Sequence, residues 1–436
     1  MEFSASVDAG RRVRLGYGLN LHAPRTLAEL QDGLRAVTLP LKARVAPHAR
    51  FGVGMYLPAE LAHALDPATG REGSAALADF LAEHALDAFT FNAFPYARFQ
   101  EDGLKERVFQ PAWWERDRLD YTLAVARVAT ELARAASGPR SHVSISTHCG
   151  QFGAFEDGSA KELAAIAHLA HCALEFARME ERGAPRLVLA LEPEPRSSCN
   201  DLEALARFFP RLCERGARFL EREHGVGASR AEALLRRHVG TCLDACHAAV
   251  EFEDASVVDP GTGRGVLGKL QFTSALRVPA PATNARGRAA LLALDEPRFL
   301  HQTTGRSATG RLRANDLGEL RSPSSAWLAC DEWRCHFHVP VDLDEARDEH
   351  GAPLGLATTR AFADELLARA LAGGAWALAE LHVEIETYTW DVLPAFAARA
   401  RGPEALVDGL AREYAHVVGQ LGRAGWLPAG SCAPKG

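Results

Sequence analysis

The chain has 436 residues, a length that fits two or three domains or one large α/β barrel. Hydrophobic residues make up 47% and charged residues 24%, which is typical of a globular protein and excludes a disordered or fibrous chain. The net charge of −7 gives no general attraction to polyanions, so we expect no nucleic-acid partner.

Short apolar or alternating runs recur along the chain, each followed by a longer stretch with helical periodicity. The runs predict strands at residues 15–22, 51–57, 87–94, 142–148, 186–192, 239–244, 267–273 and 381–386. Helices are predicted to begin after Thr26, Asp117 and Asn200, because these residue types cap helix N-termini. Eight alternating units predict an α/β fold closed into a (β/α)8 TIM barrel, with an open doubly wound sheet as the alternative.

The interval between the seventh and eighth strands is unusually long, since 386 − 271 = 115 positions separate Gln271 from Glu386. It contains two strand-like runs, FLHQTTG at 299–305 and WRCHFHVPV at 333–341, joined by a polar Gly/Ser segment. We therefore predict one barrel domain over residues 1–436, with a hairpin-containing insertion over residues 277–356 that serves as a lid.

The nine cysteines are odd in number and include no CxxC pair, which argues against a disulfide framework and for a reducing cytoplasm. We interpret Cys149 and Cys246 as packing residues, because neither has a clear base beside it. The N-terminus lacks a signal-peptide pattern, and the most apolar stretch, 366–381, is interrupted by Arg369 and two glycines. No membrane span is predicted.

In such a barrel the reactive side chains lie at the C-terminal ends of the strands. The predicted strands bring there His148, Glu192, Glu194, Asp244, His247, Gln271, Glu384 and Glu386, and the insertion adds His336 and His338. Each has an ordinary alternative: a strand-end Glu is more often a salt-bridge partner, and Asp244 could cap a helix. Together, carboxylates that end three strands repel one another unless a cation lies between them. Oxygen and nitrogen donors suit Mn²⁺, Zn²⁺, Fe²⁺ or Co²⁺.

Further polar and aromatic residues are candidates for substrate binding: His22, Asn92, Tyr96, Lys105, Trp113, Glu194 and Glu384. Several of them belong to the long loop after the third strand, which also contains Trp114 and Arg118. This loop could cover the mouth of the barrel and contact the substrate, or it could be an aromatic loop packed on the next helix. Glu194 and Glu384 could also orient a metal ligand or exchange a proton.

Longer motifs resemble one superfamily. LVLALEPEP, VGTCLDACH, KLQFTSAL and HVEIETYTWDVLP are similar to the xylose-isomerase-like TIM barrels, which include sugar isomerases, 3-epimerases and nucleases of the endonuclease IV type. More narrowly, YGLNLHAPRT, CHFHVPV, ETYTWDVLP and the long loop FNAFPYARFQEDGLKERVFQPAWWERDRLDYT resemble the EboE family, described as metabolite-traffic proteins of a bacterial gene cluster. This likeness covers about residues 14–425.

The superfamily resemblance implies a set of metal ligands. They are Glu192, Asp244, Gln271 and Glu386, with Gln271 at a position where histidine is usual. His336 or His338 could supply an imidazole in its place. In the nuclease branch imidazoles bind further metals, and His148, His247 and His338 resemble those positions.

The resemblance also implies isomerase or epimerase chemistry. A metal that binds two oxygens of a polyol or hydroxyketone acidifies the C–H between them, and Glu192 and Glu386 could remove and return the proton through an enediolate. We therefore expect a metal-dependent protein that acts on a small sugar or cyclitol. A non-catalytic metabolite-binding or traffic protein is the main alternative, and a metal-dependent phosphodiesterase is a weaker one.

Overall fold

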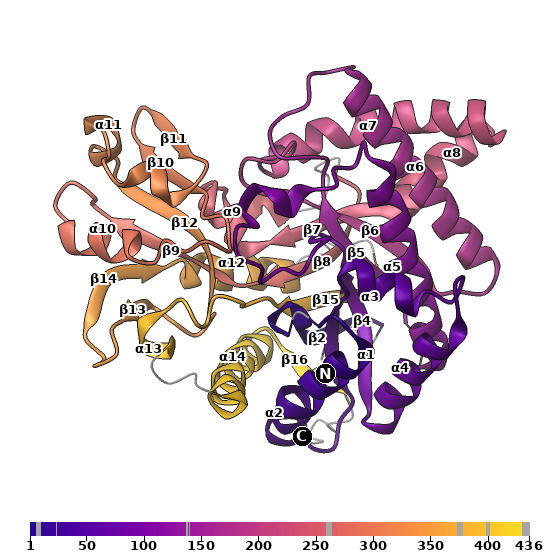
Figure 1. Ribbon diagram of the computed structural model, residues 1–436, viewed down its shortest axis with the longest axis horizontal. Coiled ribbons are helices and arrows are strands. Elements are labelled where there is room, and N and C mark those ends of the chain that lie inside the picture. The colour runs from indigo at the N-terminus through magenta and orange to yellow at the C-terminus, as the bar shows by residue number, and fades with distance from the viewer. Residues whose placement is uncertain are drawn as a thin grey trace.

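Eight parallel strands in the described part of the chain close into a barrel, as predicted (Figure 1). They are β2 (Arg12–Gly18), β3 (Phe51–Tyr56), β4 (Leu86–Asn92), β5 (Val143–His148), β6 (Leu187–Glu192), β7 (Val239–Asp244), β8 (Val266–Phe272) and β15 (Glu380–Ile385). The pairing of β15 with β2, in register from Glu380 opposite Arg12 to Ile385 opposite Tyr17, closes the ring. The computed structural model describes residues 1–5, 10–22, 24–136, 138, 140–258, 264–372, 378–397 and 402–429.

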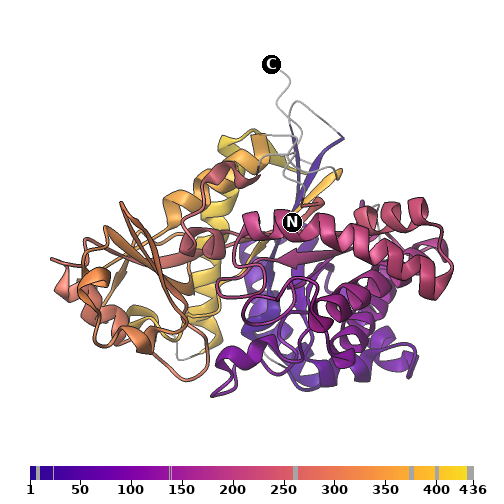
Figure 2. The ribbon, with the colours of Figure 1, turned by 90° about the horizontal axis from the view of Figure 1, so that it is seen from above.

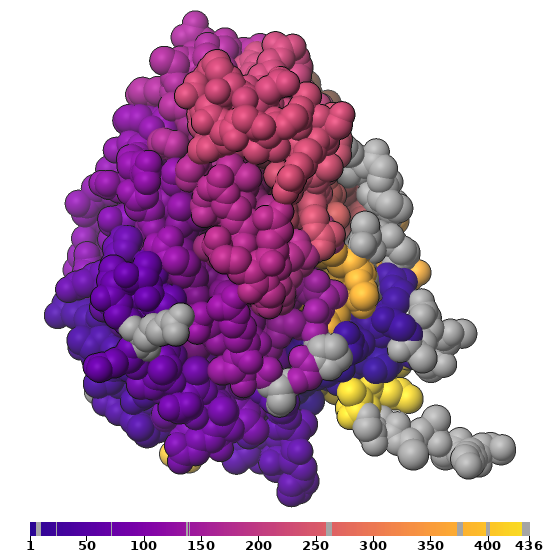
Figure 3. Space-filling view, turned by 90° about the vertical axis from the view of Figure 1, so that its right-hand side faces the viewer, coloured from indigo at the N-terminus to yellow at the C-terminus, as the bar shows by residue number. Residues whose placement is uncertain are grey.

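Helices cover the outside of the barrel. Those between β2 and β8 are α1 (Leu27–Gly33), α2 (Leu39–Val45), α3 (Ala59–Leu65), α4 (Arg71–Glu83), α5 (Arg116–Ala135), α6 (Ala160–Glu181), α7 (Leu202–His224), α8 (Ala228–His238) and α9 (Ala245–Val250). The later ones are α12 (Arg360–Ala372) and α14 (Pro403–Arg423), whereas the short α13 (Pro394–Ala397) lies beside the second sheet described below. In Figure 3 the indigo-to-pink first part of the chain forms most of the face turned to the viewer. Two short strands, β1 (Glu2–Ala5) and β16 (Trp426–Pro428), pair beside the start of β2.

A second, antiparallel sheet follows β8 and lies beside the barrel (Figures 1 and 2). Its strands are β9 (Ser274–Pro279), β10 (Thr303–Ser307), β11 (Gly310–Ala314), β12 (Glu332–Val339), β13 (Glu345–Arg347) and β14 (Pro353–Thr358), in the order β11-β10-β12-β9-β14-β13. Two short helices, α10 (Ala285–Leu292) and α11 (Ser325–Leu328), accompany it. The sheet spans residues 274–358, somewhat wider than the predicted insertion at 277–356.

The two predicted runs in this region do pair, since Thr303 of β10 lies opposite Cys335 of β12. The other strands were not predicted. Strands β11, β13 and β14 are short, and their mixed exposure gives no clear apolar alternation. The second sheet has its own core, in which Trp333, Cys335 and Phe337 of β12 take part. Since side chains alternate along a strand, His336 and His338 lie on the opposite face of β12.

Three predicted boundaries were wrong by a few residues. The first strand begins at Arg12 instead of residue 15, and residues 19–21 form a 3₁₀ turn after it. Its polar start was missed because Arg12 and Arg14 are buried or half-buried in ion pairs. Helix α7 is capped by Asp201, whose Oδ1 accepts from the Ala204 N–H at 2.8 Å, and not by Asn200.

At α5, the predicted cap Asp117 lies inside the first turn, because the helix begins at Arg116. The cap at Thr26 is confirmed, because its hydroxyl accepts from the Glu29 N–H. None of the helices in the described ranges combines the length and the apolar character that crossing a bilayer requires.

Candidate metal centre

Three carboxylates from three strands meet at the C-terminal end of the barrel. Glu192 ends β6, Asp244 ends β7 and Glu386 directly follows β15. Their ligand oxygens lie within 4.8 Å of one another, and the residues are 4%, 2% and 4% exposed. One oxygen of each, namely Glu192 Oε2, Asp244 Oδ2 and Glu386 Oε2, lacks a hydrogen-bond partner among the described residues. Buried acceptors without a donor are costly, so these oxygens fit a bound cation.

Neighbouring groups hold two of these carboxylates by their other oxygen. Asn20 Nδ2 and Asn92 Nδ2 both donate to Glu386 Oε1, at 2.9 and 3.0 Å. The backbone N–H of His247 donates to Asp244 Oδ1 at 2.8 Å, because Asp244 caps helix α9. Asp244 therefore does cap a helix, which was the alternative to a ligand role. Its Oδ2 nevertheless stays free to bind a cation. One carboxylate thus serves both purposes.

The charge of the cluster is not balanced by the side chains around it. Burial, and then the charges of Asp244 and Glu194, raise the pKa of Glu192 well above its usual value. Burial and Glu192 do the same to the pKa of Glu386. Lys269 lies inside the barrel and contacts Glu384, so its single positive charge is shared with a further carboxylate. A divalent cation would supply the missing positive charge.

Three imidazoles converge beside the carboxylates. His247 comes from α9, and His336 and His338 come from β12 of the second sheet. Their Nε2 atoms are 2.8 Å (His336 to His338), 3.2 Å (His247 to His336) and 3.4 Å (His247 to His338) apart. Nitrogens bound to one tetrahedral zinc at 2.0–2.1 Å lie about 3.3 Å from one another, so the spacing suits a shared metal.

The outer nitrogens of these rings determine which way the lone pairs point. His247 Nδ1 donates to the Pro193 carbonyl at 3.1 Å, and His338 Nδ1 donates to the Glu386 carbonyl at 2.9 Å. His336 Nδ1 donates to Gln302 Oε1 at 2.5 Å. With the protons on Nδ1, the three Nε2 lone pairs face one another.

The imidazoles are neutral because they are buried. Burial lowers the pKa of His247 to about 3 and that of His338 to about 4. Burial, followed by the neighbouring histidines, lowers the pKa of His336 well below its usual value. Neutral imidazole is the form that binds a metal.

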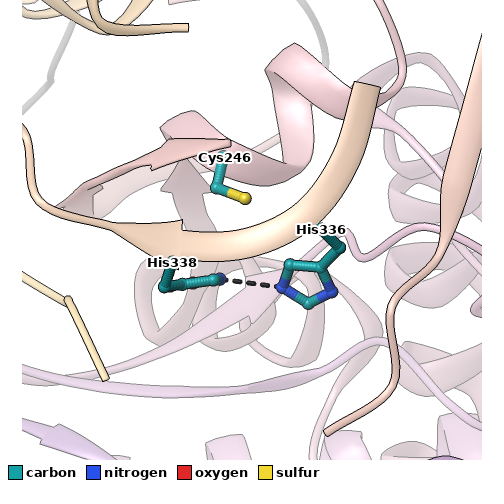
Figure 4. A group of neighbouring side chains, drawn as sticks. All are labelled: Cys246, His336 and His338. Carbon is teal, nitrogen blue, oxygen red and sulfur yellow. Dashed lines mark hydrogen bonds between the residues drawn. The ribbon is translucent and has the colours of Figure 1, made fainter. Parts of the chain in front are cut away.

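Cys246 also lies near this cluster, with His336 and His338 (Figure 4). Its thiol donates to the Phe337 carbonyl at 3.6 Å, and Figure 4 draws it on the other side of the β12 ribbon from the two rings. Burial raises the pKa of both Cys246 and Cys149 well above the usual value. These observations support packing roles, although Cys246 Sγ lies within 4.8 Å of a ring nitrogen of both His336 and His338.

A pocket of about 40 Å³ adjoins Glu192, Glu386 and the three imidazoles. Its polar lining residues are Asn20, Asn92, Lys105, Glu192, Glu194, His247, Arg298, His336, His338 and Glu386. Its apolar lining residues are Phe94, Pro95, Phe99, Leu104, Val108, Phe299, Leu300 and Tyr388. The space is enough for one or a few water molecules.

Solved structures similar to this chain are distant from it. An IolI protein with a binding zinc atom is 10% identical, with 92% of this chain and 99% of that chain covered and a TM-score of 0.40. L-ribulose 3-epimerase is 15% identical, with 93% of this chain and 98% of that chain covered and a TM-score of 0.36. A xylose isomerase-like TIM barrel/4-hydroxyphenylpyruvate dioxygenase fusion protein is 13% identical, with 94% of this chain covered and a TM-score of 0.38. The chain spans only 44% of that fusion protein.

No family model and no curated protein matches the chain. We therefore assign the fold from the barrel topology itself. The eight parallel strands and their closing pair stand independently of these likenesses.

Two predicted metal ligands have other contacts in the structure. Gln271 Oε1 accepts from Cys242 Sγ at 2.8 Å, and its Nε2 lacks a partner among the described residues. His148 lies between the rings of Phe94 and Phe109, at centroid distances of 5.1 and 5.6 Å. It belongs to none of the possible ligand groups in the described chain.

The predicted substrate-binding residues divide into two sets. Asn92, Lys105 and Glu194 line the pocket. Trp113 is fully buried and donates from Nε1 to Thr147 Oγ1 at 3.1 Å. His22 and Tyr96 are not among the pocket-lining residues. The long loop is thus partly a packed aromatic loop and partly a pocket wall.

Glu384 lies one layer deeper than the pocket. It contacts Lys269 inside the barrel and is 1% exposed. Glu194 accepts from Gln302 Nε2 at 2.9 Å, and burial raises its pKa to about 8. Gln302 therefore links Glu194 to His336.

Sequence patterns did not indicate several residues of the site: Asn20, Lys269, Gln302, Phe99, Phe299 and Tyr388. Lys269 had one usable signal, because it precedes Gln271 by two positions and so shares its face of β8. Phe99 and Phe299 come from connecting segments without a periodic pattern, so their convergence depends on the fold.

Proposed function

We propose that this protein is a divalent-metal-dependent enzyme that isomerises or epimerises a small hydroxylated metabolite. The observation that carries the proposal is the set of unpaired carboxylate oxygens on Glu192, Asp244 and Glu386. They lie in a buried pocket beside three imidazole Nε2 atoms that face one another. This donor set fits the metal that the sequence motifs imply.

Oxygen and imidazole donors suit Mn²⁺, Zn²⁺, Fe²⁺ or Co²⁺. Glu192, Asp244 and Glu386 would hold one such ion, and His247, His336 and His338 could hold a second. When bound, the metal supplies Lewis acidity that polarises two adjacent oxygens of a hydroxyketone or polyol and acidifies the C–H between them.

The protein's own residues would then move the proton. Glu192 ends β6 and Glu386 follows β15. Strands β7 and β8 lie between these two strands, so the two carboxylates reach the pocket from different sides. One carboxylate removes the proton from carbon and the other returns it, at the same carbon for epimerisation or at the neighbouring carbon for isomerisation. Asn20 and Asn92 keep Glu386 in place during the transfer.

A metabolite-binding or traffic protein of the EboE type, without catalysis, is the second candidate. The position of Gln271 favours it, because an amide that accepts from Cys242 is a weak replacement for the usual histidine ligand. Membership of the EboE family is itself part of this proposal.

Metal content and turnover test the first candidate. Protein purified with Mn²⁺ or Zn²⁺ in the medium should retain a stoichiometric ion and interconvert members of a panel of ketoses, aldoses and inososes. Glu386→Gln should lose both properties, whereas Glu60→Gln, at an exposed position on α3, should keep them. Protein that retains no ion, or turnover that is indifferent to Glu386→Gln, would contradict the proposal.

A further inference from the structure

Three aromatic rings that contact one another line the pocket beside the candidate metal centre. We call Phe99, Phe299 and Tyr388 the collar. Their ring centroids lie 5.1 Å (Phe99 to Phe299), 4.6 Å (Phe99 to Tyr388) and 5.0 Å (Phe299 to Tyr388) apart. The rings come from three segments that are distant in the sequence, namely the loop after β4, the connection before β10 and the chain after β15.

The collar touches the reactive end of the site. Tyr388 stacks on His338 with centroids 4.4 Å apart, and its hydroxyl lies 3.5 Å from His336 Nε2. A molecule bound at the imidazoles therefore lies close to Tyr388. Leu104, Val108 and Leu300 extend the same apolar wall.

Most polar groups around the pocket are already engaged. Lys105 Nζ lies 2.8 Å from Asp316, and Arg298 lies 2.7 Å from both Glu296 and Asp391. These two cations are therefore neutralised by acidic residues of their own surroundings. The amides of Asn20 and Asn92 donate to Glu386, as described above.

The pocket is thus divided into two halves. The half at the carboxylates and imidazoles, with Glu194, can bind oxygen atoms. The other half offers mainly ring faces and aliphatic side chains, where a hydroxyl group would lose its hydrogen bonds with water and regain few of them. A sugar with hydroxyls along its whole length matches only the first half.

We propose that the substrate carries a hydroxyketone or vicinal diol at one end and an apolar ring, such as an aryl group, at the other. The oxygen-bearing end binds at the metal centre and the ring binds within the collar. This inference rests on the proposed function for the chemistry at the carboxylates, but it concerns the other half of the pocket.

The small volume of the pocket bears on how such a ligand would bind. About 40 Å³ is less than an aryl ring occupies, so the collar rings would have to move apart to admit one. An entering aryl ring replaces the ring–ring contacts of Phe99, Phe299 and Tyr388 with contacts of its own. A fully hydroxylated ligand would separate the same faces without that compensation.

Two ligands with the same reactive end test the proposal. Hydroxyacetone and 2-hydroxyacetophenone both carry an α-hydroxyketone and differ in a methyl or phenyl substituent. Titration calorimetry of the Mn²⁺-loaded protein should give a dissociation constant at least about 30-fold lower for the phenyl compound, as expected for burying a ring in place of a methyl group. Phe299→Ala should reduce this ratio to about 3-fold or less, because most of the ring's buried contact is lost.

Control variants separate the collar from general damage to the protein. Phe299→Leu keeps an apolar wall and should retain part of the preference, and Tyr388→Phe keeps the ring and should retain most of it. Thermal unfolding of each variant shows whether it is folded. L-erythrulose, a hydroxyketone with additional hydroxyls, should bind more weakly than 2-hydroxyacetophenone.

Equal affinity for the phenyl and methyl compounds, tighter binding of L-erythrulose, or no binding of any of the three would overturn the proposal. So would a phenyl preference that Phe299→Ala leaves intact. Titration of Mn²⁺ into EDTA-treated protein, before the ligand titrations, keeps the two proposals apart. Failure to bind Mn²⁺ contradicts the metal-dependent function, whereas Mn²⁺ binding without a phenyl preference contradicts only the substrate class.

Discussion

The two ends of the barrel bury the same kind of residue in opposite ways. At the N-terminal end, Asp87 and Glu380 are buried and paired with arginines: Arg14 lies 2.7 Å from Asp87 and 3.0 Å from Glu380. Arg12 also lies 2.8 Å from Glu380, and Arg140 lies 2.8 Å from Asp87. At the C-terminal end, Glu192, Asp244 and Glu386 are equally buried, yet Lys269 is the nearby cation and it is engaged by Glu384.

The pKa values follow this difference. Burial alone would raise the pKa of Asp87 and Glu380. Arg140 and Arg14 lower that of Asp87, and His382 and Arg14 lower that of Glu380. Burial and mutual repulsion raise the pKa of Glu192 and Glu386. His142 and His382 lie near Glu380, but that carboxylate is bound by arginines, so we expect no metal there. The buried carboxylates at one end of the barrel are thus compensated by basic side chains, and those at the other end largely are not.

The largest effect should come from removing a carboxylate at the C-terminal end. Asp244→Asn should weaken Mn²⁺ or Zn²⁺ binding by about 100-fold or more, since even groups that only orient a metal ligand contribute 10–100-fold. The metal-free protein should be no less stable than the wild type, because the change removes repulsion. Metal titration and denaturant unfolding in EDTA measure the two effects. A marked loss of metal-free stability would contradict this account.

Removing an ion-pair partner at the N-terminal end should instead lower the stability and leave metal affinity unchanged. Arg14→Met leaves Asp87 and Glu380 buried with fewer partners, so the free energy of unfolding should fall by about 3–5 kcal/mol. Metal affinity should stay within about twofold, because the change lies at the far end of the barrel. Urea unfolding and metal titration test this pair of outcomes, and a substantial loss of metal affinity with intact stability would refute it.

The pH dependence of stability should also separate the two ends. The pKa of Glu194 is raised to about 8 by burial, so its contribution to stability is complete below its unfolded value and is lost as pH rises through about 8. The lowered pKa of Glu380 acts in the other direction, because its contribution is lost only as pH falls toward strongly acidic values. In EDTA, stability should therefore decline between about pH 5 and 9, by roughly 2–4 kcal/mol.

Added Mn²⁺ should reverse this decline, since it binds the charged carboxylates. Glu194→Gln should flatten the EDTA profile. Stability in EDTA that keeps rising beyond pH 8 would show that the carboxylates at the C-terminal end are already compensated by the protein itself.

The smallest effect is expected at His148. Because aromatic rings surround it and it joins no ligand group, His148→Gln should leave the bound metal per chain unchanged, with less than about a twofold change in affinity. His338→Gln is the matched variant and should remove an ion from the imidazole cluster. Elemental analysis distinguishes the two, and metal loss in His148→Gln would place this residue among the ligands after all.

The sequence predicted the barrel well for a physical reason. Buried parallel strands are continuous apolar runs, and all eight could be found from them. The start of β2 was missed because Arg12 and Arg14, which form ion pairs with the buried Glu380, interrupt such an apolar run. The second sheet was largely missed because its outer strands are short and exposed.

The centre of the site could be anticipated for a related reason, because strand ends of a barrel converge wherever the strands lie in the sequence. Glu192, Asp244 and Glu386 follow from that rule. The collar does not, because Phe99 and Phe299 lie in connections whose paths no local pattern determines. Hydrogen-bond partners such as Gln302 were also beyond prediction, since they depend on how the second sheet packs on the barrel.

The position of bound metal is the most direct test of the central claim. Crystals grown with Mn²⁺ or Zn²⁺, measured on both sides of the metal's absorption edge, show where the ion lies. We expect anomalous density between Glu192, Asp244 and Glu386, with a second peak among His247, His336 and His338 if two ions bind. Crystals without density among the three carboxylates would contradict the account, even if metal were bound elsewhere.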